Sequence, residues 1–138
     1  MRTILALLLL VAAPLAAQSP AAPPSDADVR QLGDRMTRWL LAGQSDSVFA
    51  HMSGQLRERI GGRDGVAEAA AELIAELGAE TAVHMQSVTR GNGAPEYWRL
   101  SSFSLVDDEP LVFHWMFDTA GAATGLGVSP LSDTPPAD

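Results

Sequence analysis

The chain has 138 residues and a formal net charge of −8 at pH 7, from nine basic and seventeen acidic residues. An acidic surface of this kind repels phosphate backbones and anionic lipid head groups, which argues against nucleic-acid binding and against binding at a membrane surface. The chain contains no cysteine, so disulfides are excluded and core burial alone must stabilise the fold.

Residues 1–17 have the three parts of a cleavable signal peptide. A positive charge at Arg2 precedes an apolar run over residues 4–13, and small residues end the segment. The apolar run is shorter than the about 20 residues that cross a bilayer, and Pro14 disfavours the alternative of a hydrophobic first helix of the fold. We therefore expect export to the periplasm or the extracellular space, with no membrane association after cleavage. Residues 18–25, rich in Pro and Ala, are expected to be a flexible spacer.

The next part of the sequence predicts helices, because apolar residues recur there at intervals of three and four. Ser25 and Asp28 have the form of an N-terminal capping box, and Gly43 suits the end of the first helix. A cap at Ser45 to Ser47 is expected to begin the second helix. The expected helices are residues 26–42, 46–52 and 54–60, followed after the break at Gly61-Gly62 by a helical stripe over 66–77 that Gly78 ends.

From Thr81 the pattern becomes strand-like, with turn residues between short segments. Short connections of this kind join neighbouring antiparallel strands. Helices followed by such a meander predict an α+β domain over residues 26–130, with N-terminal helices packed against a curved antiparallel four-stranded sheet. Residues 131–138 are expected to be a disordered tail. The expected strands are 81–89, 96–105, 111–117 and 122–128.

Two of the strands indicate where the interior lies. Phe113 and Trp115 alternate with residues that are also mostly apolar, which predicts a central strand with one face on the helices. This strand could belong to the core, to a cavity wall or to a dimer face. Tyr97 and Arg99 share one side of their strand and Trp98 takes the other. Arg99 is expected to pair with a neighbour such as a glutamate, or to bind a carboxylate ligand.

The sequence carries none of the strong catalytic signatures, such as Gly-x-Ser-x-Gly, Ser-x-x-Lys, a phosphate-binding loop or His-Glu-x-x-His. Its histidines, His51, His84 and His114, lie on three different elements, and two of them stand in apolar stretches typical of core histidines. We therefore expect no metal site and no cofactor, and we assign no catalytic residue.

The order of these elements resembles the nuclear transport factor 2-like superfamily, also called SnoaL-like or cystatin-like. The resemblance rests on the first helix ending at Gly43, the short second helix followed by residues 53–57, and a last hairpin that contains Phe117-Asp118-Thr119-Ala120-Gly121. More narrowly, the chain is similar to small exported bacterial domains that often precede serine hydrolase domains. The resemblance implies a cone-like fold with an apolar pocket, often a homodimer through the sheet, and a serine hydrolase as a partner.

Three functions follow as expectations. The favoured one is a non-catalytic accessory domain that binds a small apolar ligand. The alternatives are an isomerase- or dehydratase-like enzyme with a pocket histidine as general base, and a module that dimerises through the strand around Trp115. The candidate pocket residues are Trp39, His51, Met52, His84, Trp98, His114 and Trp115.

Overall fold

A computed structural model describes residues 22–107 and 109–131 of the chain. The expected signal peptide at 1–17 lies outside the described residues, as do positions 18–21 of the expected spacer and 132–138 of the expected tail. The described part begins with a non-helical stretch at residues 22–25, and its first helix starts at Asp26.

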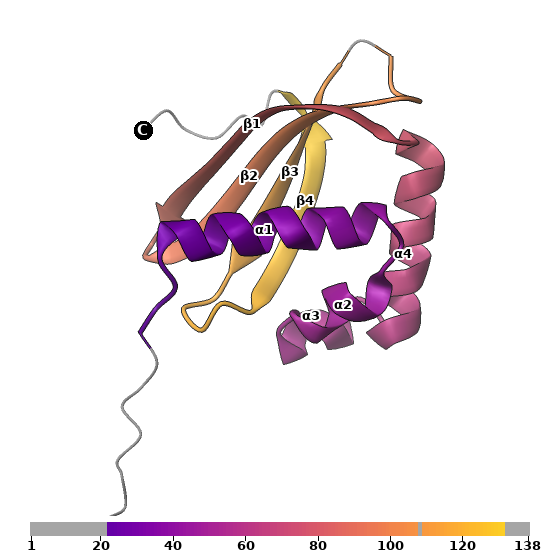
Figure 1. Cartoon of the computed structure of the whole chain (residues 1–138). Helices are drawn as coiled ribbons and strands as arrows, with labels where there is room; N and C mark the ends of the chain where they lie inside the picture. The colour runs from indigo at the N-terminus through magenta and orange to yellow at the C-terminus, as the bar shows by residue number, and fades with distance from the viewer. Residues whose placement is uncertain (1–21, 108, 132–138) are drawn as a thin grey trace, which may run out of the picture.

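In the described part of the chain four helices precede four strands, and the helices pack on one side of a curved antiparallel sheet (Figure 1). The predicted α+β fold is confirmed. The helices are α1 Asp26–Leu41, α2 Ser45–Ala50, α3 Gly54–Arg59 and α4 Gly62–Leu77, and the strands are β1 Glu80–Gly91, β2 Ala94–Phe103, β3 Leu111–Phe117 and β4 Ala123–Pro130.

Side-chain capping explains where two of the four described helices, α1 and α3, begin. The Ser25 hydroxyl accepts a hydrogen bond from the Asp28 amide, and the Asp28 side chain accepts one from the Ser25 amide, so the predicted capping box is present. Hydrogen bonds from the Ser25 hydroxyl, and then from the Ser25 amide, to the Asp28 carboxylate hold the pKa of Asp28 below its usual range. The Ser53 hydroxyl caps α3 by accepting a hydrogen bond from the Leu56 amide, without the reciprocal bond of a capping box. The second helix differs from the prediction, because it begins at Ser45 after Gln44, and Gln44 makes no side-chain cap.

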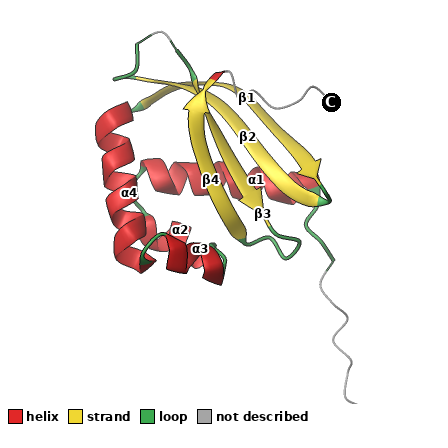
Figure 2. Ribbon diagram, turned by 180° about the vertical axis from the view of Figure 1, so that it is seen from behind, coloured by secondary structure: helices red, strands yellow, loops and turns green. Residues whose placement is uncertain are grey.

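The strands follow one another in the order β1-β2-β3-β4, each antiparallel to the next. Asn92 and Gly93 form the two-residue turn between β1 and β2, and both have positive φ, which suits the twist of a hairpin. β3 lies in the interior of the sheet, as its apolar pattern predicted. Figure 2 shows the side of the sheet that no described helix crosses.

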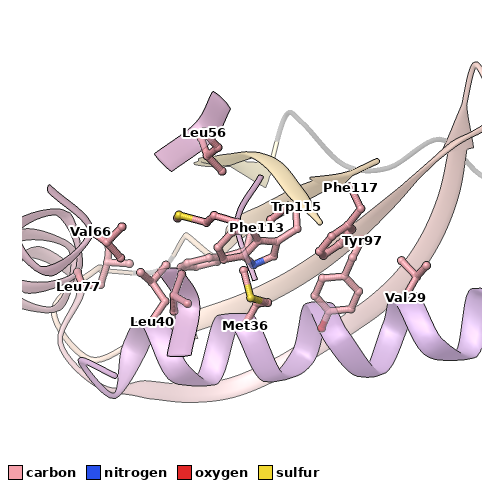
Figure 3. Packing of buried hydrophobic residues seen from close by; sticks show 14 of the residues in the cluster. Val29, Met36, Leu40, Leu56, Val66, Leu77, Tyr97, Phe113, Trp115 and Phe117 are labelled. Carbon is pink, nitrogen blue, oxygen red and sulfur yellow. The ribbon is translucent and has the colours of Figure 1, made fainter. Parts of the chain in front are cut away.

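The core lies between α1 and the inner face of the sheet (Figure 3). Along β2 every second side chain is buried, so Tyr97 and Arg99 share one side of the strand, as predicted, and that side faces α1. The register places Tyr97 opposite Trp115 on β3. The largest fully buried side chains include Trp115, Tyr97, Phe113, Phe117 and Met36.

Candidate functional site

A cavity of about 250 Å³ lies between helices α3 and α4 and strands β3 and β4. The break at Gly61-Gly62 lets α3 and α4 turn toward the same space. Each helix then contributes apolar side chains to it, while the strands supply the opposite wall. The lining residues are Leu40, Met52, Leu56, Ile60, Val66, Ala69, Leu73, Trp115, Leu126 and Val128.

The wall of this cavity offers no free polar group from its lining side chains. Nine of them are aliphatic or thioether side chains, and the tenth, Trp115, has one N–H donor. That N–H donates to the Thr37 hydroxyl at 3.0 Å, and the hydroxyl in turn donates to the Gly33 carbonyl at 2.9 Å. The cavity therefore suits an apolar molecule, held by burial and shape.

A shallow groove of about 350 Å³, here called the Arg59 groove, runs along the outside of the same wall. It is lined by Leu56, Arg59, Ile60, Met116, Thr124, Gly125 and Leu126. Three of these residues, Leu56, Ile60 and Leu126, also line the cavity. The two spaces are therefore neighbours that share one wall.

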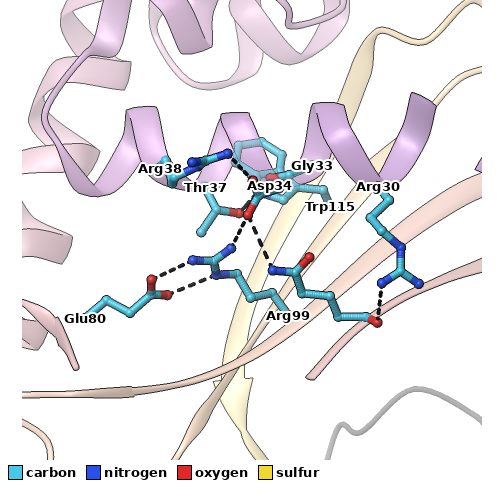
Figure 4. Close-up of polar contacts among 9 residues, drawn as sticks. Arg30, Gly33, Asp34, Thr37, Arg38, Glu80, Arg99 and Trp115 are labelled. Atoms are coloured by element: carbon cyan, nitrogen blue, oxygen red, sulfur yellow. Dashed lines mark hydrogen bonds and ion pairs between the residues drawn. The ribbon is translucent and has the colours of Figure 1, made fainter. Parts of the chain in front are cut away.

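A buried ion cluster joins α1 to β1 and β2 on the other side of the interior (Figure 4). Arg99, only 3% exposed, donates two hydrogen bonds to Glu80, at 2.5 and 3.0 Å, and one to Asp34 at 2.5 Å. Arg38 also pairs with Asp34. The predicted pairing of Arg99 with a glutamate is thereby confirmed, and Asp34 on α1 is a second partner that the sequence did not indicate.

Burial shifts the pKa values of Arg99 and Tyr97 on the inner face of β2. Burial is the largest influence and lowers the pKa of Arg99, but the hydrogen bonds and charge of Glu80 together with Tyr97 outweigh it, so the pKa rises above its ordinary value. The pKa of Tyr97 is also raised, because burial disfavours the phenolate, although the charge of Arg99 partly opposes the shift. The Arg99 cation is therefore permanent, and Tyr97 is neutral at physiological pH.

The seven candidate pocket residues occupy several places. Met52 and Trp115 line the cavity, as the pocket hypothesis expected. Trp39 and His51 lie next to each other, with ring centroids 5.0 Å apart, but they are not among the lining residues. The His51 Nδ1 atom lies 2.9 Å from the Ser47 carbonyl oxygen.

The other three candidates lie away from the cavity. Trp98 and His114 are cross-strand neighbours on the face opposite Tyr97 and Trp115, and their rings stack with centroids 3.6 Å apart. His114 Nε2 also lies 3.1 Å from a Glu96 carboxylate oxygen. His84 is exposed on β1, with its Nε2 atom 2.7 Å from the Ser102 hydroxyl. The described histidines thus stand at three separate places.

Sequence reasoning missed most of the cavity wall, although it identified some of its members as inward-facing. The helical stripe over residues 66–77 was predicted from the sequence, but Leu126 and Val128 were not singled out. The alternation of β4, whose inner residues pair with Phe113 and Trp115, is the signal that identifies them. Nothing in the sequence marked Arg59 as a candidate functional residue, because a single arginine at a helix end is common.

Among the described residues, no helix has the length and apolar character needed to span a membrane. The described residues also contain no group of three or more His, Cys, Asp or Glu side chains placed to hold a metal ion. Comparisons with protein-family models, with curated proteins and with solved structures found no match. Membership of the nuclear transport factor 2-like superfamily therefore stays a prediction from the resemblance.

Proposed function

We propose that this chain is an exported, non-catalytic accessory domain that binds a small apolar ligand in the cavity between α3, α4 and the sheet. The observation that carries the proposal is an apolar cavity of about 250 Å³ inside a small domain. Protein interiors are close-packed and contain few voids larger than a water molecule. Since a cavity of about 150 Å³ holds benzene, this one has room for about ten non-hydrogen atoms.

The chemistry of the wall supports a binding role. Transfer of apolar surface from water into such a site is favourable by about 25 cal/mol per Å², and the Trp115 N–H is already paired, so a ligand needs no polar group there. None of the three histidines is among the ten lining residues, so the structure adds no support to an enzyme with a pocket histidine. A serine hydrolase as the partner of this accessory domain is part of the proposal and follows from the resemblance.

A matched pair of substitutions on α4 tests the binding proposal. Ala69 lines the cavity and is exposed at its mouth, whereas Ala71 is exposed on the same helix and is not among the lining residues. Ala69→Leu should fill the mouth, and Ala71→Leu should not. With naphthalene as the probe, we expect the melting temperature to rise for the wild type and for Ala71→Leu, and to rise much less for Ala69→Leu. No rise in the wild type, or an equal rise in all three proteins, would contradict the proposal.

Dimerisation through the sheet is a second candidate, favoured by the sheet face that no described helix covers (Figure 2). That face carries Trp98, Leu100 and Met116, and Met116 is 37% exposed. Sedimentation should then show a dimer, and Met116→Glu should release monomers by placing a charge in the interface. Ala71→Glu on α4 is the control that should leave the dimer intact. A monomeric wild type would remove this candidate.

A further inference from the structure

Arg59 is an exposed cation at the end of α3 that faces the Arg59 groove. Its guanidinium donates to the Thr124 carbonyl on β4 at 3.0 Å. It forms no ion pair with any described carboxylate, whereas Arg38, Arg63, Arg90 and Arg99 all do. One of its five N–H donors is thus used to fix its position, and the others remain available to an acceptor in the groove.

The position of Arg59 connects it with the cavity. Leu56, Ile60 and Leu126 line both the cavity and the Arg59 groove. A ligand whose apolar body fills the cavity would meet the guanidinium beside β4 if its end passes between these shared side chains. The combination of an apolar interior and one cation at the adjoining groove suits an amphipathic molecule with a polar end.

The net charge of the chain and the single charge of Arg59 indicate which kind of polar end the ligand carries. The chain has a net charge of −8, so its surface disfavours an anion unless a local cation offsets the repulsion. A single free guanidinium matches one negative charge, and its planar fork suits a carboxylate held through two N–H bonds. A phosphate dianion would bring twice the charge to the same single cation.

We propose that the ligand is a monocarboxylic acid with an apolar body, whose carboxylate is bound by Arg59 while the body fills the cavity. This inference rests on the proposed function, because it names the chemical class of the ligand for the same site. Arg59 selects the ligand through its charged end, and the cavity supplies the burial.

Decanoate and 1-decanol test the inference, because they share an apolar chain and differ in the charged end. By calorimetric titration we expect the wild type to bind decanoate about tenfold more tightly than 1-decanol, which corresponds to one charge-assisted hydrogen-bonded contact. Arg59→Gln should bind both compounds equally. Arg35→Gln is the matched control, because Arg35 is also exposed and outside any described ion pair, and its preference for decanoate should be retained.

The outcomes separate the inference from the proposed function. Equal binding of both compounds by the wild type would overturn the role of Arg59 and leave an apolar ligand in the cavity. A preference for decanoate that survives in Arg59→Gln would overturn it as well. Absence of binding by either compound would overturn both proposals. Melting temperatures of the two variants, measured without ligand, establish that each is folded.

Discussion

The two halves of the interior differ in how completely they are filled. Under α1, the inner side chains of β1 and β2 meet the helix directly, and Arg99 joins Glu80 and Asp34 in a buried ion cluster. Under α3 and α4, strands β3 and β4 face a cavity of about 250 Å³ with an apolar wall. One half therefore fixes the helix on the sheet, and the other leaves room for a ligand.

The contact between Gly33 and Tyr97 illustrates the tightness of the filled half. Tyr97 is fully buried, and a Cβ atom on Gly33 would lie 2.2 Å from the Cγ atom of the Tyr97 ring. A glycine in the middle of a helix costs about 1 kcal/mol relative to alanine. Its presence here is explained by the ring that occupies the place of its side chain.

The largest expected effect comes from breaking the ion cluster. Arg99→Met leaves Glu80 and Asp34 without their shared cation, and we expect a loss of about 3 kcal/mol of unfolding free energy in urea titrations. The exposed pair of Arg63 with Asp46 provides the control, since Arg63→Met should change stability by less than about 1 kcal/mol. Equal losses of unfolding free energy in the two variants would mean that the Arg99 cluster does not fix α1 on the sheet.

A somewhat smaller effect is expected from Gly33→Ala. The added methyl group must displace the buried Tyr97 ring, and overpacking of this kind costs about 2 to 3 kcal/mol despite the better helix propensity of alanine. Gly54→Ala, at a position where a Cβ atom would meet nothing within 4 Å, should be nearly neutral in the same urea titration. If Gly33→Ala were neutral too, the tight contact between α1 and β2 would be refuted.

The smallest expected effect concerns the Tyr97 hydroxyl, which is buried and makes no hydrogen bond of normal geometry with a described residue. Because the folded state raises the pKa of Tyr97, this group stabilises the fold below the unfolded pKa of about 10 and loses that contribution as the pH rises further. Stability should therefore fall above about pH 10 in the wild type, and Tyr97→Phe should remove this part of the decline.

Tyr97→Phe should also be as stable as the wild type at pH 7, or more stable by up to about 1 kcal/mol, because it removes an unpaired buried polar atom. Tyr97 is the one tyrosine of the chain, so tyrosinate absorbance reports its titration directly. A titration midpoint at or below pH 10 in the folded protein would contradict the burial of this ring.

Sequence patterns predicted the helices and strands of both halves. They did not predict that one half is filled and that the other contains a cavity. Periodicity located the four helices and four strands to within a few residues, and strand alternation placed Tyr97 and Arg99 together. The same alternation puts His114 and Trp115 on opposite faces of β3, so strand parity already separated these two pocket candidates. A hypothesis that groups aromatic and histidine residues by type ignores this parity.

The remaining features depend on packing between distant segments. Asp34 lies 65 residues before Arg99, and no local pattern marks it as a partner. The residues around the cavity are ordinary core types, so their composition does not reveal whether the space between them is filled. That volume depends on the angle at which α3 and α4 meet the sheet, which is a property of the folded chain.

The most direct test of the central claim is a methyl NMR titration with 1-decanol, because it reports on both halves in one experiment. We expect chemical-shift changes at Leu56, Leu73 and Val128, which line the cavity, and none at Val29 or Val88, which pack in the filled half. Changes spread evenly over both sets, or confined to the filled half, would contradict the account.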